Sequence, residues 1–151
     1  MILLCYDGSD DARRAIAVAH ATLGHKPAAV LHVWRPLGEF LAPDPGGALS
    51  PPPGPSIVEL ERLALERAEE LAHQGFELAR HHGFAAEARA ERSDANVWRT
   101  ILDVADEVDA ETIVVGARGL STVASALLGS VSNAVVHHSE RPVLVIPGNS
   151  R

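Results

Sequence analysis

The sequence predicts an α/β fold: a single-domain, Rossmann-like open parallel sheet with helices on both faces. Short apolar runs alternate with helical patterns, which is typical of βα units that build a parallel sheet. Hydrophobic residues make up 46% of the 151 residues and aromatic residues only 4%. A core of Ala, Val, Leu and Ile suits helices packed on a buried parallel sheet. The length fits one domain and no internal repeat is visible, so we expect one domain over residues 1–151.

The first βα unit is predicted at the amino-terminus. Ile2–Tyr6 is a buried-strand candidate that ends at Asp7-Gly8-Ser9. Ser9 can cap a helix with acidic residues in its first turn, and Gly24 is a plausible stop. Ala28–Trp34 is the second predicted strand.

Residues 35–55 break the pattern. This Pro/Gly-rich stretch holds seven of the ten prolines and is longer than an ordinary connection. Two interpretations remain open, a solvated linker and a lid near a ligand site.

The second half continues the alternation. Ser56–Glu59 forms a capping box for a long helix that Gly83 ends. Its predicted inner face consists of Leu60, Leu63, Ala64, Leu71, Gly75 and Leu78. Further predicted elements are a weaker strand at Phe84–Ala90, a helix starting at Asp94 or Asn96 with Val97, Ile101, Val104 and Val108 on one stripe, strands at Thr112–Val115 and Val143–Ile146, and a helix at Ser130–Ser139.

A glycine pattern follows the Thr112–Val115 strand. Gly116-Ala117-Arg118-Gly119 is separated by nine residues from Gly129-Ser130-Val131-Ser132. Glycines after a buried strand allow close backbone approach, and a helix N-terminus at Ser130 offers free N–H groups suited to phosphate. Ser130 and Ser132 add hydroxyl donors, and Arg118 adds a cation. The pattern predicts a phosphate site, although such joints also exist merely to turn the chain. We expect Gly119 and Gly129 to leave no room for a Cβ toward the ligand, or to need backbone angles that other residues resist.

These segments, together with Asp7-Gly8-Ser9, Val30-Leu31-His32-Val33 and Arg141–Pro147, resemble the ATP-binding subgroup of the universal stress protein family. The resemblance covers nearly the whole chain and departs mainly at residues 38–55. It implies a five-stranded parallel sheet in the order 3-2-1-4-5. In that order the loops that start at Asp7 and Gly116 meet at a topological switch point, where ligands lodge.

The resemblance also implies site roles. Asp7, with Gly8 and Ser9 beside it, would contact the ribose or organise Mg²⁺ near the phosphates, and the backbone of Val33 would read the adenine edge. The segments 116–119 and 129–132 would hold the ribose and triphosphate. The implied ligand is ATP, with Mg²⁺ as an optional companion and no dedicated protein metal site. Asp7 could instead serve only as a helix-entry turn residue, and Val33 only as core.

Composition excludes several other functions. The net charge is −7 and no basic stripe appears, so we expect no nucleic-acid partner. The only lysine, Lys26, follows no glycine-rich loop, so the Walker and protein-kinase patterns fail. Eight histidines include the adjacent pairs 81–82 and 137–138, which we assign to helix C-termini rather than to a metal site, and His32 reads as a satisfied interior group.

The sequence also gives an expectation for the cellular location. Cys5 is the only cysteine, and neither a signal-peptide pattern nor a membrane-spanning run is visible, so a cytoplasmic protein without a membrane partner is expected.

Three functions remain in competition. The favoured one is an adenine-nucleotide-binding regulatory module of the stress response, homodimeric through residues 142–147, as the family resemblance implies for this apolar edge strand. The alternatives are a slow ATPase and a nucleotide-independent dimerisation or signalling domain. No catalytic residue is predicted, because the motif contains no evident base.

Overall fold

The protein folds around one five-stranded parallel sheet. The computed structural model describes residues 1–36, 55–119 and 128–148. Along the chain the elements are β1 (Ile2–Cys5), α1 (Asp10–Leu23), β2 (Pro27–Trp34), α2 (Ile57–His81), β3 (Ala85–Arg92), α3 (Val97–Glu107), β4 (Thr112–Gly116), α4 (Ser130–His138) and β5 (Val143–Ile146). Most of the stretch 35–55 that we interpreted as a linker or lid lies outside the described residues.

The predicted strand order is confirmed. The strands lie in the order β3-β2-β1-β4-β5, and all four neighbouring pairs are parallel. Since β1 pairs with both β2 and β4, the order reverses at β1. The loops after β1 and β4 therefore emerge side by side at the carboxyl edge of the sheet.

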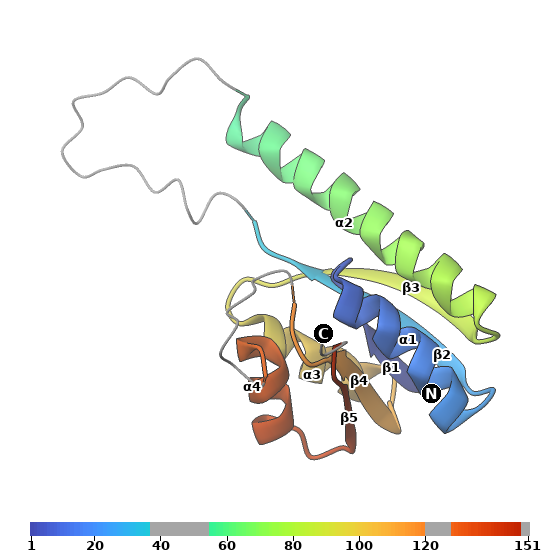
Figure 1. Cartoon of the computed structure of the whole chain (residues 1–151). Coiled ribbons are helices and arrows are strands. Elements are labelled where there is room, and N and C mark those ends of the chain that lie inside the picture. Colours follow the sequence, from blue (N-terminus) through green and yellow to red (C-terminus); the bar gives the residue numbers. More distant parts are fainter. Residues whose placement is uncertain (37–54, 120–127, 149–151) are drawn as a thin grey trace.

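Helices cover both faces of the sheet (Figure 1). One core cluster packs α1 and α2 against the face formed by Ile2, Leu4 and Val30. The other packs α3 and α4 against Leu3, Leu31 and Ile113. Both faces of the central strands are buried, so β1 and residues 113–115 of β4 are continuously apolar rather than alternating.

The first helix is set by its caps, as predicted. The Ser9 hydroxyl accepts the N–H of Ala12 at 3.1 Å, and Asp10 and Asp11 lie in the first turn. Gly24 ends the helix at φ 75°, a conformation that favours glycine. The first strand is one residue shorter than predicted. Tyr6 leaves the ladder, although its N–H still donates to the Leu31 carbonyl at 2.8 Å.

The long helix α2 matches its predicted inner face in its second half and departs from it in its first turns. Its cap is as expected, because the N–H of Glu59 donates to Ser56 Oγ at 3.2 Å. Gly75 is buried, and Leu71 and Leu78 pack against the core, as predicted. Leu63 is instead 46% exposed. Figure 1 shows the reason: the first turns of α2 extend past the sheet, so the apolar stripe continues where no strand lies beneath it.

The remaining boundaries differ by small amounts. Of the two predicted starts for α3, Asn96 is the N-cap residue, while Asp94 pairs with Arg92 at 2.6 Å. The third strand runs to Arg92, two residues beyond the prediction. It is an edge strand paired on one side only, and its alternation of alanines with charged residues reflects that position.

Gly75 is the point of closest approach between α2 and the sheet. A Cβ at this residue would lie 2.7 Å from Val30 Cγ1 and 2.8 Å from the Tyr6 ring, and both side chains belong to the core. We predict that Gly75→Ala lowers the free energy of unfolding. Overpacking costs about 1–3 kcal/mol, which outweighs the helix-propensity gain of about 1 kcal/mol.

Urea unfolding followed by circular dichroism measures this change. Gln74→Ala, on the exposed side of the same turn, is the control and should shift stability by about 0.5 kcal/mol or less. A stabilised Gly75→Ala protein would contradict the packing described here.

Candidate functional site

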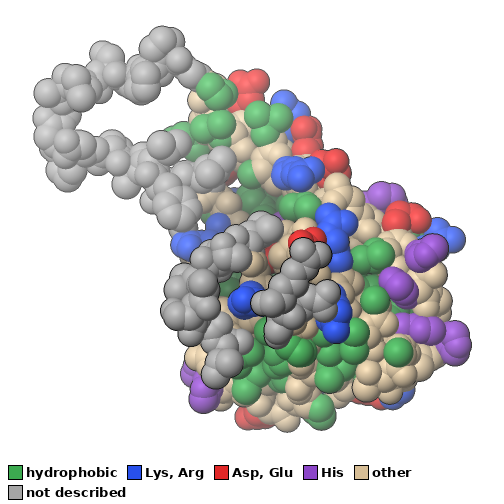
Figure 2. Space-filling view, in the orientation of Figure 1, with side chains coloured by type: hydrophobic (Ala, Val, Ile, Leu, Met, Phe, Trp, Pro, Cys, Tyr) green, Lys and Arg blue, Asp and Glu red, His purple; other side chains and the backbone are tan. Residues whose placement is uncertain are grey.

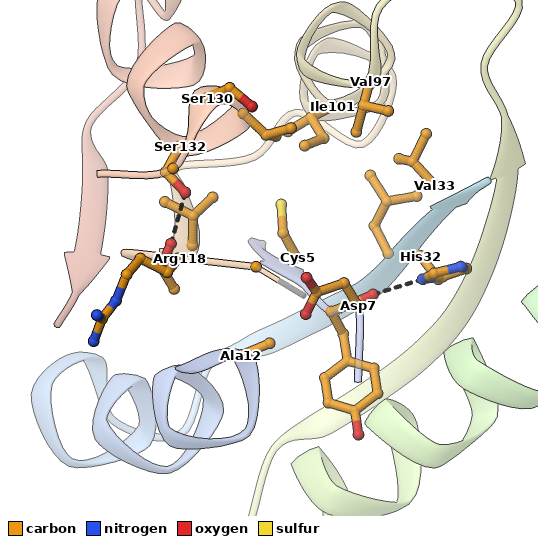
Figure 3. Close-up of a pocket in the computed structure, with 17 residues that line it drawn as sticks. Cys5, Asp7, Ala12, His32, Val33, Val97, Ile101, Arg118, Ser130 and Ser132 are labelled. Carbon is orange, nitrogen blue, oxygen red and sulfur yellow. Dashed lines mark hydrogen bonds between the residues drawn. The ribbon is translucent and has the colours of Figure 1, made fainter. Parts of the chain in front are cut away.

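A cavity of about 320 Å³ opens at the carboxyl ends of β1, β2 and β4. It lies at the predicted switch point, between the loop after β1, the loop after β4 and the N-terminus of α4 (Figure 3). The residues that line it are Cys5, Tyr6, Asp7, Ala12, Leu31, His32, Val33, Val97, Ile101, Val115, Gly116, Arg118, Gly119, Gly129, Ser130, Val131 and Ser132. The volume is within the range of small-molecule sites.

The turn after β1 fixes the position of the Asp7 carboxylate. One oxygen, Oδ1, accepts the N–H of Ser9 at 2.9 Å, and Gly8 takes φ 82° to close the turn. The other oxygen faces Gly119, where a Cβ would lie 2.7 Å from Asp7 Oδ2. A side chain at Gly119 would therefore have to displace the Asp7 carboxylate, because the loops after β1 and β4 lie close together at this point.

Gly116 is a glycine for a different reason. A Cβ there would lie 2.9 Å from the backbone carbon of Asp11 and 3.0 Å from the nitrogen of Ala12. The end of β4 thus packs directly against the first turn of α1. The Gly116 carbonyl accepts the hydroxyl hydrogen of Ser132 at 2.7 Å, which joins α4 to the same point.

Gly129 does not need an unusual backbone conformation, contrary to our expectation. As the N-cap of α4 it has φ −68°, and a Cβ would have ordinary contacts at 3.5 Å with Ala117 O and Arg118 Cα. Its N–H donates to the Ala117 carbonyl at 2.7 Å, which seats the start of the helix on the loop after β4.

The N-terminus of α4 faces the cavity with backbone N–H groups that have no acceptor among the described residues. The first intrahelical bond runs from Asn133 N–H to Gly129 O at 2.9 Å, so the N–H groups of Ser130, Val131 and Ser132 precede the helical ladder. No side chain caps this helix. Ser130 is exposed, whereas Ser132 is buried and its hydroxyl donates to the Gly116 carbonyl. Backbone amides, with the Ser130 hydroxyl, are thus the donors available to an anion here.

The guanidinium of Arg118 points away from the cavity. Its Nε lies 3.5 Å from Asp11 Oδ2, and its backbone N–H donates to the same oxygen at 3.1 Å. Figure 3 shows the side chain directed toward α1, while only its base borders the cavity. The predicted cation of the motif therefore pairs with a carboxylate that we did not single out.

The opposite wall is apolar. Val33, Val97 and Ile101 group together beyond Cys5 in Figure 3, and Leu31 and Val115 complete this side. Burial, together with the nearby Asp7 carboxylate, raises the pKa of the Cys5 thiol to about 12. The thiol is therefore neutral at physiological pH and adds to the apolar surface.

Two of these wall positions were interpreted differently from the sequence. Val97 and Ile101 were predicted as core of the α3 stripe, and only the tertiary structure turns that end of α3 toward the cavity. His32 behaves as expected, because its Nδ1 lies 2.8 Å from the Tyr6 carbonyl. Among the predicted site residues, Gly8, Ser9 and Ala117 do not line the cavity; they shape the turn, cap α1 and seat Gly129.

The described residues contain neither a cluster of metal-binding side chains nor a membrane-spanning helix. No group of three or more His, Cys, Asp or Glu side chains is placed to hold a metal ion in these parts of the chain. None of the helices in the described ranges is both long and apolar enough to cross a bilayer. Lys26 precedes β2 at the opposite end of the sheet, where it pairs with Glu111.

Comparison with known proteins identifies the family. The family model of the universal stress protein family matches residues 1–147. The chain belongs to the universal stress protein family. A universal stress protein of Thermus aquaticus is 34% identical over 161 aligned positions, which cover 96% of both chains. Other curated relatives match over a part only: the chain spans 31% of a Synechocystis universal stress protein, which is 50% identical over 48 residues.

Solved structures agree with this assignment. A protein whose biochemical function was itself assigned from its structure has the same fold, with a TM-score of 0.76 at 23% identity, over 99% of this chain and 96% of that one. The universal stress protein of Archaeoglobus fulgidus in complex with dAMP is 26% identical, with a TM-score of 0.61, over 96% of this chain and 95% of that one.

Proposed function

We propose that this universal stress protein is a cytoplasmic regulatory module that binds an adenine nucleotide, with ATP as the ligand, in the cavity beside β1 and β4. The observation that carries the proposal is the meeting, in one cavity, of an apolar wall and a helix N-terminus with free amides. The apolar side fits a purine base, and the amides of residues 130–132 fit phosphate oxygens. The dAMP complex of the Archaeoglobus fulgidus relative supports the same ligand class.

Asp7 divides these two regions. Its Oδ1 is held by Ser9 N–H, while Oδ2 lies on the Gly119 side. A carboxylate in that position suits ribose hydroxyls, which can donate to it, or a Mg²⁺ ion that also binds the phosphates. The backbone of Val33, at the end of β2, lies on the apolar side where the base would pack.

Nucleotide binding is tested by calorimetry with ATP, ADP, AMP and cyclic AMP. We predict that Gly129→Val weakens ATP binding at least tenfold, about 1.4 kcal/mol, because branched methyl groups would stand at the open end of α4. Asn133→Val is the control, since Asn133 is exposed on the same helix and does not line the cavity. A folded Gly129→Val protein with unchanged affinity would show that the site is misplaced, and a wild-type protein that binds none of the four would end the proposal.

We further propose that bound ATP is hydrolysed slowly or not at all. Rapid phosphoryl transfer needs charge stabilisation that develops in the transition state, usually from Lys, Mg²⁺ or an arginine finger. Here the lysine is remote and the Arg118 guanidinium pairs with Asp11. The cavity therefore lacks the side-chain cations that usually stabilise the developing charge, and no residue of the glycine motif is an evident base.

Steady-state phosphate release with Mg²⁺ should therefore stay well below the ~10 s⁻¹ median of enzymes. Arg118→Ala is compared with Arg62→Ala, an exposed arginine on α2 that pairs with Glu66. A Mg²⁺-dependent rate near that median, abolished only by Arg118→Ala, would favour the ATPase alternative.

A homodimer through residues 142–147 is the third part of the proposal. The two edges of the sheet differ in character. The edge strand β3 carries charged residues, including Arg89 in contact with Glu91 and Glu107, whereas β5 is Val-Leu-Val-Ile with its first three residues partly exposed. An apolar edge with unpaired backbone groups favours pairing with a second copy, and a two-fold axis makes that pairing antiparallel.

We predict that Val145→Lys converts a dimer into a monomer, measured by light scattering at micromolar protein. Ala88→Lys, at an exposed position of the opposite edge strand β3, is the matched control and should remain dimeric. A monomeric wild-type protein, or a dimer that Val145→Lys leaves intact, would overturn this interface. Neither outcome bears on nucleotide affinity.

A further inference from the structure

Three atoms with lone pairs converge at the amino-terminal end of the sheet, away from the cavity. They are Nε2 of His20 in the last turn of α1, Nδ1 of His25 just before β2, and the carbonyl oxygen of Gly83 in the turn between α2 and β3. His20 Nε2 lies 3.3 Å from His25 Nδ1, which lies 3.4 Å from Gly83 O. Figure 2 shows several histidine side chains on this side of the molecule, at the right of the view.

Packing holds His20 and Gly83 in place. The His20 ring meets the ring of Phe84 edge-on, with centroids 5.2 Å apart, and Phe84 belongs to the core. Gly83 has φ 97°, and a Cβ there would lie 3.0 Å from His20 Nε2. Only glycine lets the α2–β3 turn close so tightly onto the two imidazoles.

With both imidazoles neutral, only one proton is available for the two contacts around His25 Nδ1. A neutral imidazole carries one N–H, so the contact between His20 Nε2 and His25 Nδ1 contains at most one proton when both rings bond to each other. If His20 donates, His25 Nδ1 presents a lone pair to the Gly83 carbonyl. If His25 donates, one N–H is shared between His20 Nε2 and Gly83 O, with the second contact at 3.4 Å. Either way, lone pairs outnumber the hydrogens that face them.

The spacing matches a metal coordination shell. Two ligand atoms, each about 2.0–2.1 Å from a tetrahedral zinc ion, are about 3.3–3.4 Å apart. The distance from His20 Nε2 to His25 Nδ1 and the distance from His25 Nδ1 to Gly83 O both lie in this range. His25 is exposed, so its ring can turn the small amount needed to aim Nδ1 at an ion beside the line of contact. Lys26, the next residue, is ion-paired with Glu111, which reduces the repulsion that an incoming cation would meet.

We propose that His20, His25 and the Gly83 carbonyl bind a divalent first-row metal ion of the kind that prefers imidazole, such as Zn²⁺, with water completing its shell. The site has two side-chain ligands, so it binds more weakly than a structural site with four. The ion links the end of α1, the start of β2 and the α2–β3 turn. Because it binds the folded chain, it raises the melting temperature.

The test uses the full-length protein without an affinity tag. Zn²⁺ is titrated in competition with a chromophoric chelator, and Co²⁺ is added separately to record the visible absorption of tetrahedral coordination. We expect saturable binding of one ion per chain and a higher melting temperature with Zn²⁺. His25→Gln and His20→Gln should each weaken Zn²⁺ binding by at least about tenfold.

Two controls separate this site from the other histidines. His73→Gln removes an exposed histidine on α2 that lies 3.8 Å from Glu77. The double variant His81→Gln/His82→Gln removes the pair next to Gly83. Both should keep wild-type affinity. The proposal is overturned if the wild-type protein shows no saturable binding, if His25→Gln binds as tightly as wild type, or if the double variant accounts for the loss. His25→Gln is the decisive variant, because His25 is exposed and its replacement leaves the contact of His20 with Phe84 in place.

Discussion

The contact between the end of β4 and the first turn of α1 is the constraint on which the candidate site depends. With no Cβ, Gly116 rests against the backbone of Asp11 and Ala12, and its carbonyl holds the Ser132 hydroxyl. One residue thereby fixes β4, α1 and α4 relative to one another. The next residue, Ala117, extends the joint, since its N–H donates to Ile146 O and its carbonyl accepts the N–H of Gly129. The cavity exists because these backbones meet without side chains between them.

The same joint decides the electrostatics of the cavity. Bringing α1 so close places Asp11 against the loop after β4, where it takes both the N–H and the guanidinium of Arg118. The positive character that remains at the cavity comes from the amides and dipole of α4. Fixed dipoles of this kind stabilise an anion at the cavity.

The two ends of the sheet carry different chemistry. At the carboxyl end, glycines bring backbones together and leave amide donors facing a cavity. At the amino-terminal end, Gly83 brings a backbone carbonyl against two imidazoles and gathers acceptors. In both places a glycine permits two segments of the chain to approach closely. Amide donors at one end suit an anion, and a carbonyl acceptor at the other end suits a cation.

Much of the fold could be read from the sequence, because local physics sets it. Short apolar runs indicated β1, β2, β4 and β5. Ser9, Gly24 and Ser56 indicated helix ends through hydrogen bonds and backbone angles that depend only on neighbouring residues. The spacing from Gly116 to Ser132, with the family resemblance, located the cavity.

The remaining features depend on residues far apart in the chain. Three features follow from where each helix docks and not from its own sequence pattern. Asp11 pairs with Arg118, Val97 and Ile101 line the cavity, and Leu63 lies beyond the sheet. A helical stripe indicates that one face of the helix is apolar, but it does not indicate which element will cover that face. His20, His25 and Gly83 lie up to 63 positions apart, and only the packing of α1, β2 and α2 brings them together. The sequence determined the elements and their ends, and the tertiary structure decided which polar groups would meet, because those meetings depend on docking distances that no local pattern encodes.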